Sequence, residues 1–167
     1  MNRIEVNAGE APLPPWAPRA EEYILKVLDR VGRDGWDLSV LFCDDAYIRS
    51  LNARFRGMDE ATDVLSFALG ETSEDAGIGK RYLPGDIVIS LETLAENARY
   101  FKVSEDEELR RLLVHGVLHL DGLDHGAHLD PAGDPMLRLQ EQILTELSGE
   151  HILPSGAFPA KLPAEEP

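Results

Sequence analysis

Residues 104–125 read SEDEELRRLLVHGVLHLDGLDH, and this stretch holds the strongest pattern in the chain. Ser104 followed by Glu107 has the form of a capping box, which predicts a helix beginning just after Ser104. Apolar residues continue to Leu120, and Gly122 can take the left-handed conformation that ends a helix. The sequence therefore predicts one long helix that ends in a tight turn near Gly122.

Three of the five histidines lie within this stretch. His115 and His119 are four residues apart, so a helix places them on one face, one turn apart. The chain bends after Gly122 and can return His125 to the same point. Three neutral imidazoles with an open fourth position are typical of catalytic zinc. We therefore expect one zinc ion per chain, held by His115, His119 and His125; ordinary histidines and a structural zinc remain the alternatives.

Three neighbouring polar residues could extend this site. Asp121 and Asp124 could orient the histidine rings by accepting their N–H groups, although Asp121 also fits a solvated loop. His128 follows three residues after His125 and is assigned no role.

The histidine and glycine spacing matches the long zinc-peptidase motif HExxHxxGxxH, so the expected metal site is zincin-like. In those peptidases the glutamate takes a proton from zinc-bound water. Gly116 occupies that position here and cannot do so. A peptidase would need a base from elsewhere in the chain, which leaves a metallohydrolase of another substrate as an alternative function.

The remaining patterns predict a single α+β (mixed α/β) domain over residues 1–149 and a Pro-rich C-terminal tail over residues 150–167. Residues 86–90 are continuously apolar after the first position, which is typical of a central strand. Residues 62–69 should form an edge strand, and residues 70–84 a loop. Counting all segments, we expect strands at 3–7, 38–43, 62–69 and 86–90, and helices at 16–31, 45–55, 91–101, 105–120 and 135–148.

Charge and composition restrict the possible functions. The chain has 167 residues, with 16 Lys and Arg against 31 Asp and Glu, a net charge of −15. Such a protein can bind nucleic acid only through a local basic cluster. Arg49, Arg54, Lys80 and Arg81 could form one, although Arg49 and Arg54 also fit a solvated helix face. No apolar run approaches the roughly 18 residues that span a bilayer. The single cysteine, Cys43, permits no intrachain disulfide and indicates a cytoplasmic protein.

Residues 115–125 match the HGxLHLxGxDH signature of the YbeY endoribonucleases, and the chain resembles this family of rRNA maturation factors over about residues 36–148. Two positions depart from the family pattern: Ala68 replaces a common proline, and Leu123 replaces a common aromatic residue. Neither is a predicted ligand. Other blocks agree in order, namely Leu51-Asn52, Phe55-Arg56, Asp59, residues 62–67, residues 85–89, Met136 and Gln140-Glu141.

The resemblance implies a fold, a site and partners. The family fold packs helices against a four-stranded mixed sheet. Its zinc ligands correspond to His115, His119 and His125, and Arg56 corresponds to a functional arginine that faces the metal cleft. The implied activity is that of a zinc-dependent, single-strand-type endoribonuclease in small-subunit rRNA 3′-end maturation and ribosome quality control. The implied partners are rRNA, the small ribosomal subunit, its proteins and biogenesis factors. A non-catalytic, zinc-stabilised biogenesis factor remains an alternative, and the oligomeric state stays open.

Overall fold

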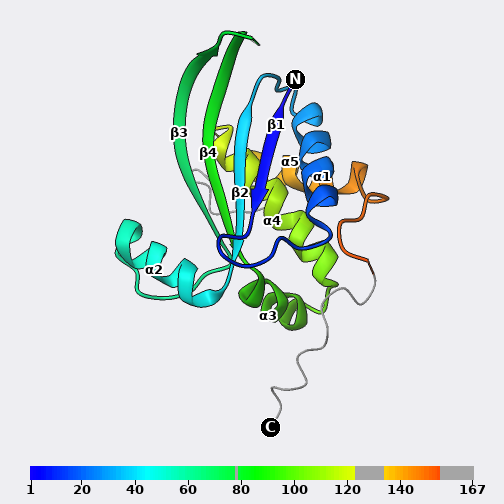
Figure 1. The fold of residues 1–167 in the computed structure, drawn as a ribbon. Coiled ribbons are helices and arrows are strands. Elements are labelled where there is room, and N and C mark those ends of the chain that lie inside the picture. The colour runs from blue at the N-terminus through cyan, green and yellow to red at the C-terminus, as the bar shows by residue number, and fades with distance from the viewer. Residues whose placement is uncertain (78, 123–133, 155–167) are drawn as a thin grey trace.

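The computed structural model describes residues 1–77, 79–122 and 134–154, which form one four-stranded sheet and five helices (Figure 1). This confirms the predicted mixed α/β fold. The elements in chain order are β1 (Arg3–Asn7), α1 (Ala17–Arg30), β2 (Asp37–Cys43), α2 (Asp45–Arg56), β3 (Val64–Asp75), β4 (Gly79–Ser90), α3 (Leu91–Phe101), α4 (Glu105–Leu120) and α5 (Pro135–Glu146).

The strands lie in the order β1-β2-β4-β3. Strands β1, β2 and β4 are parallel, and β3 runs antiparallel to β4. Strand β4 is therefore central and β3 lies at an edge, as the sequence predicted. Alternate residues of β2 are buried, beginning with Leu38, so one face of the sheet carries most of the core.

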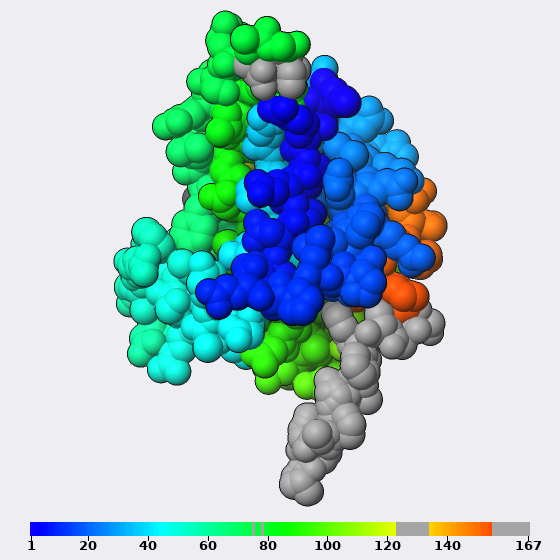
Figure 2. All heavy atoms as spheres, in the orientation of Figure 1, coloured from blue at the N-terminus to red at the C-terminus, as the bar shows by residue number. Residues whose placement is uncertain are grey.

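Helices α1, α4 and α5 cover that face, behind the sheet in Figure 1. Helix α4 is the central helix, because it contacts α1, α3, α5 and both strands of the β3–β4 pair. A smaller cluster of Ile48, Leu65 and Val88 packs α2 against the opposite face. Figure 2 shows α2, in cyan, protruding at one side of the molecule. Among the described helices, none combines the length and apolar character that crossing a membrane requires.

The loop predicted over residues 70–84 is wrong, because β3 continues to Asp75 and β4 already begins at Gly79. The two arms pair in register, for example Glu74 with Lys80. Their residues are mostly polar and exposed, so they lack the apolar alternation that identifies a half-buried strand. Gly85 begins the inner part of the pair, where a Cβ would lie 2.0 Å from the Phe67 carbonyl oxygen.

The segment after α5 packs against the domain as far as the structure describes it. Ile152 and Leu153 belong to the main core, at 0% and 5% exposure. Their backbone N–H groups donate to Asp106 Oδ1, over 2.7 and 2.8 Å. Residues 150–154 therefore complete the domain that was expected to end at residue 149.

Candidate functional site

Helix α4 carries the first two predicted ligands. Its capping residue Ser104 accepts a hydrogen bond from the Glu107 N–H, as the capping box predicted. His115 and His119 lie on its half-buried side, and their ring centroids are 4.9 Å apart. The helix ends at Leu120, and Gly122 follows with a left-handed φ of 93°. The two imidazoles are therefore adjacent just before the chain turns.

Gly116 allows α4 to pack closely against the sheet. A Cβ at Gly116 would lie 2.9 Å from Cδ1 of Ile87, a fully buried residue of β4. The position that carries the general base in zinc peptidases therefore faces the sheet, and a glutamate there would collide with Ile87. This packing adds a steric argument against the peptidase alternative.

Gln140 of α5 holds the ring of His115. Its Oε1 lies 2.9 Å from His115 Nδ1, and Gln140 is only 5% exposed. An amide oxygen accepts hydrogen bonds, so this contact favours the tautomer that is protonated at Nδ1. The Nε2 atom of His115 then keeps its lone pair, as a metal-binding imidazole requires. An ion pair between Arg111 and Glu141 further joins α4 to α5.

Sequence reasoning assigned no role to Gln140, although a signal was available. The buried stripe of α5 consists of Met136, Gln140, Ile143 and Leu144. A polar residue in an apolar stripe needs a hydrogen-bonding partner, and the ring N–H of a nearby histidine can supply one.

The third predicted ligand, His125, lies outside the described residues, as do Asp124 and His128. Within residues 1–77, 79–122 and 134–154, no three His, Cys, Asp or Glu side chains form a metal-binding group. Asp121 is described, and its Oδ1 accepts from Arg33 Nε over 2.6 Å. The two described imidazoles, one of them oriented by the Gln140 side-chain amide, nevertheless fit the ligand set of a zinc site.

Arg56 is the last residue of α2, and Gly57 ends this helix with a left-handed φ of 72°. Its guanidinium donates to the Ser66 carbonyl oxygen on the edge strand β3, over 2.7 Å. Ser66 pairs in register with Ile87, the residue on which Gly116 rests. Arg56 is therefore tied to the edge strand at the residue that pairs with Ile87, while α2 and α4 pack on opposite faces of the sheet.

The predicted basic track is smaller than expected. Arg49 forms an ion pair with Asp59, and Arg81 is 3% exposed and bound to Asp37. Both charges are thus neutralised by neighbours. Arg54 and Arg56 are exposed and have no carboxylate partner within the described part of the chain. Lys80 is exposed on the outer part of β4, so at the end of α2 only Arg54 of the predicted track remains beside Arg56.

Cys43 is not a nucleophile in this structure. It packs against the cluster under α2, and burial raises the pKa of its thiol to about 12. The thiol is therefore protonated at neutral pH. Cys43 therefore acts as a packing residue.

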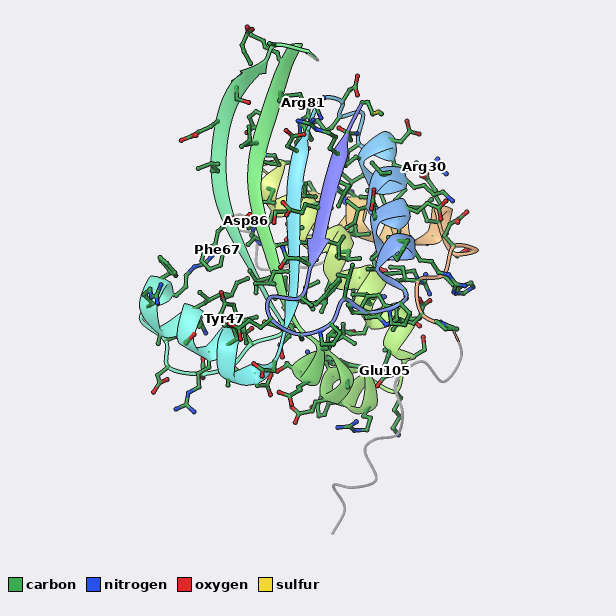
Figure 3. All side chains as sticks on the ribbon, viewed as in Figure 1. Arg30, Tyr47, Phe67, Arg81, Asp86 and Glu105 are labelled. Atoms are coloured by element: carbon green, nitrogen blue, oxygen red, sulfur yellow. The ribbon has the colours of Figure 1, made fainter. Side chains whose placement is uncertain are left out.

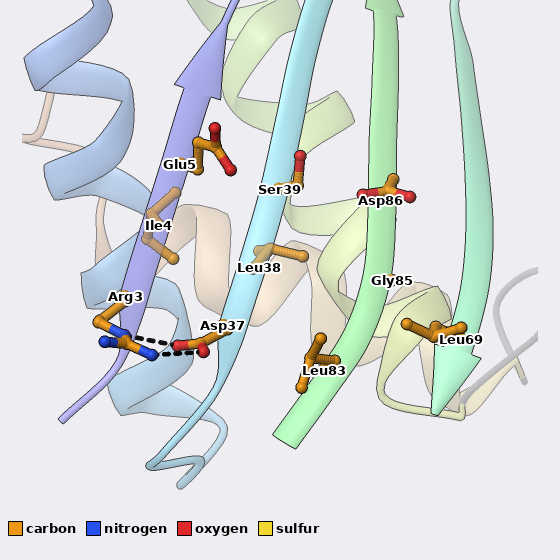
Figure 4. Close-up of a pocket in the computed structure, with 10 residues that line it drawn as sticks. All are labelled: Arg3, Ile4, Glu5, Asp37, Leu38, Ser39, Leu69, Leu83, Gly85 and Asp86. Atoms are coloured by element: carbon orange, nitrogen blue, oxygen red, sulfur yellow. Dashed lines mark hydrogen bonds and ion pairs between the residues drawn. The ribbon is translucent and has the colours of Figure 1, made fainter. Parts of the chain in front are cut away.

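The exposed face of the sheet has a shallow pocket of about 420 Å³. Figure 4 shows its lining, in which the Arg3 guanidinium is paired with the Asp37 carboxylate. Glu5 and Asp86 also line it, and neither has a basic partner among the described residues. The pocket is consequently acidic.

Comparison with known proteins identifies the family of this chain. The profile of a family described as Endoribonuclease YbeY matches residues 13–148. The chain belongs to the YbeY family. It is 45% identical over 147 residues to the Endoribonuclease YbeY of Treponema pallidum (strain Nichols), covering 87% of this chain and 90% of that protein. The YbeY of Treponema denticola is 43% identical over 152 residues, covering 90% and 97%.

A solved structure of related sequence has the same fold. The solution structure of TM1509 from Thermotoga maritima superimposes with a TM-score of 0.61 and 29% identity. The match covers 90% of this chain and 91% of that one. The family membership inferred from residues 115–125 is therefore confirmed.

Proposed function

We propose that this YbeY-family chain is a zinc-dependent endoribonuclease of the cytoplasm that acts in small-subunit rRNA 3′-end maturation and ribosome quality control. The observation that carries the proposal is the pair of adjacent imidazoles on α4, one of them held by Gln140. Arg56 supports it, because its guanidinium is bound to Ser66 on the edge strand β3 and has no carboxylate partner among the described residues. Hydrolysis of a phosphodiester needs a metal ligand set and a cation for the phosphate, which we propose are brought together at this edge of the sheet.

One zinc ion per chain would be held by His115, His119 and His125. When bound, zinc supplies a Lewis acid and lowers the pKa of a coordinated water. Gln140 holds the His115 ring in the tautomer that leaves Nε2 available. The remaining ligand, His125, follows the Gly122 turn, which redirects the chain after α4.

Arg56 would bind the phosphate. Its contact to Ser66 uses one N–H of the guanidinium, so the other donors stay available for phosphate oxygens. A planar fork of donors stabilises the extra negative charge that develops on these oxygens during cleavage. The backbone contact also fixes the side chain before substrate arrives, which reduces the ordering needed on binding.

Two alternatives differ in what they predict. A peptide hydrolase would need a base from elsewhere in the chain, because position 116 is a glycine packed on Ile87. A non-catalytic, zinc-stabilised biogenesis factor would bind partners without turnover. The acidic pocket with Glu5 and Asp86 suits a basic protein of the small ribosomal subunit, which we include among the proposed partners together with rRNA.

Single-turnover cleavage of a defined single-stranded RNA by zinc-loaded variants tests the proposal. Arg56→Glu should abolish cleavage while zinc stays bound, and Arg56→Lys should give an intermediate rate because lysine lacks the bidentate fork. Arg54→Glu is the matched comparison, because Arg54 lies at the same end of α2. Its effect on RNA binding should be weaker and should depend on salt. Wild-type cleavage by Arg56→Glu would exclude this mechanism. Zinc-independent RNA binding without any turnover would favour the biogenesis factor.

A further inference from the structure

Two aromatic rings meet where the end of α2 approaches the edge strand β3. Phe55 is 56% exposed, and its ring packs edge-on against Phe67 with centroids 5.5 Å apart. Figure 3 shows Phe67 in the region between β3 and the end of α2. Phe67 also packs against the cluster of Ile48, Leu65 and Val88, so it is supported from below. Phe67 therefore supports the Phe55 ring, and more than half of Phe55 is exposed to solvent.

Each ring has a guanidinium beside it. The Arg54 Cζ atom is 5.5 Å from the centroid of Phe55, and the Arg56 Cζ atom is 5.4 Å from the centroid of Phe67. Neither arginine has a carboxylate partner among the described residues. This is a small cationic and aromatic surface on a chain whose net charge is −15. Its charge disfavours a basic protein partner and favours an anionic one.

We propose that Phe55, Phe67, Arg54 and Arg56 form a binding site for an unpaired nucleotide of single-stranded RNA, here called the Phe55 platform. The base stacks on Phe55, and Arg54 contacts the neighbouring phosphate. Exposed aromatic rings flanked by arginines bind single strands in this way, because unpaired bases offer free faces and duplex bases do not. This inference rests on the proposed function and adds to it the residues that would hold an unpaired base next to the cleaved bond.

The position of the platform relates it to cleavage. Phe55 and Arg56 are consecutive, and Arg56 is the residue proposed to hold the scissile phosphate. A base that stacks on Phe55 therefore belongs to a nucleotide close to the cleaved bond. The platform would select RNA that is unpaired at this point, and a duplex would lose the stacking contact.

A tryptophan at position 55 reports on stacking directly. The natural tryptophans, Trp16 and Trp36, are only 7% and 5% exposed, so the new indole in Phe55→Trp is the accessible fluorophore. Titration of this variant with a 12-nucleotide oligouridine should quench its fluorescence. The same strand annealed to its complement should quench it far less. Gel analysis confirms that the RNA stays intact during the titration.

Measurements of RNA affinity and of its salt dependence then distinguish the stacking contact of Phe55 from the phosphate contact of Arg54. Phe55→Ala should bind the oligouridine about tenfold more weakly, with the same slope of log affinity against log salt, because the ring has no charge. Arg54→Ala should reduce that slope by about 0.7. The matched control is Tyr100→Ala on α3, whose ring is 79% exposed and packs edge-on against Phe101. It should bind like the wild type.

The outcomes distinguish this inference from the proposed function. Wild-type RNA affinity in Phe55→Ala would overturn the platform, even if the protein cleaves RNA normally. Fluorescence that responds to an arginine-rich peptide and not to RNA would also overturn it, in favour of a protein-docking surface. Quenching by single-stranded RNA in a protein that never cleaves RNA would support the platform and refute the catalytic proposal alone.

Discussion

Gly116 of α4 lies directly on Ile87 of β4, so closely that a Cβ on Gly116 would come within 2.9 Å of the Ile87 Cδ1 atom. Ile87 is completely buried and cannot move aside. This contact sets the distance between the sheet and the helix that carries both described histidines of the candidate site. A glycine in a helix interior is unfavourable by about 1 kcal/mol, so its presence here has a packing reason.

Gly116→Ala should therefore destabilise the protein. The overpacking cost of about 1–3 kcal/mol exceeds the gain of about 1 kcal/mol in helix propensity. Adding Ile87→Val, which removes the clashing Cδ1 atom, should recover part of the loss. Gly149→Ala is the control, since a Cβ there meets nothing within 4 Å. Urea unfolding of the four proteins measures these differences, and equal stability of Gly116→Ala and the wild type would contradict the packing argument.

Removal of the metal should lower the melting temperature, because a ligand that binds only the folded state stabilises it by mass action. His119→Ala should fail to retain zinc. His151→Ala is the matched histidine control, because His151 is bound to Asp106 and not to the other imidazoles. Elemental analysis and thermal melting with and without a chelator provide the measurement. Full zinc occupancy in His119→Ala would remove that residue from the ligand set.

Gln140→Leu should weaken zinc binding by about 10–100-fold, the usual cost of losing a residue that orients a ligand. Leucine has a similar size and preserves the packing of this buried position, which isolates the hydrogen bond to His115. Gln142→Leu is the control on the exposed side of α5, where Gln142 contacts only Glu146 among the described residues. Competition with a chromophoric chelator measures the affinity. Equal affinities of the two variants would mean that the Gln140 contact does not orient a ligand.

Asp106 should be a major source of stability. It accepts from the N–H groups of Ile152 and Leu153 and from buried Arg110. Burial alone would raise the pKa of Asp106, but these hydrogen bonds together with His151 lower it. Its contribution is therefore present above the ordinary carboxyl pKa and is lost as the pH falls through the folded value. Asp106→Ala should cost about 3–5 kcal/mol at pH 7. The difference from wild type should shrink in strong acid, as denaturant titrations across pH would reveal.

Glu108 should behave in the opposite way, although it lies only two residues along the same helix. Burial raises the pKa of Glu108, and the negative charge of Asp63 raises it further. The folded state then binds the proton more tightly than the unfolded chain, so stability falls as the pH rises through and above the ordinary glutamate pKa. Glu108→Gln should raise the melting temperature at neutral pH and have little effect in acid. A lower melting temperature at pH 7 would show that the ionised carboxylate is stabilising.

The sequence by itself determined most of the secondary structure and the family. Ser104 caps its helix as expected, and Asp44, Ser90 and Asp134 cap the helices that were expected to begin at residues 45, 91 and 135. These signals are local, because a side chain that bonds a backbone N–H two or three residues away needs no tertiary partner. The spacing of His115 and His119 is equally local, since helical geometry alone places the two rings together.

Tertiary structure alone decided the features that depend on distant parts of the chain. The polar arms of the β3–β4 hairpin form strands because their backbones pair with each other. Backbone pairing does not require alternating apolar residues, so the sequence carries no such pattern here. Ile152 is held by Asp106, 46 residues away in sequence, so a Pro-rich composition concealed its place in the core. Gln140 meets His115 only because α5 packs on α4. The charges of Arg49 and Arg81 are neutralised by partners that no spacing rule predicts, whereas Arg54 and Arg56 have no carboxylate partner in the part of the chain that the structure describes. The physical reason is common to these cases: hydrogen bonds and ion pairs between separate elements depend on how those elements pack.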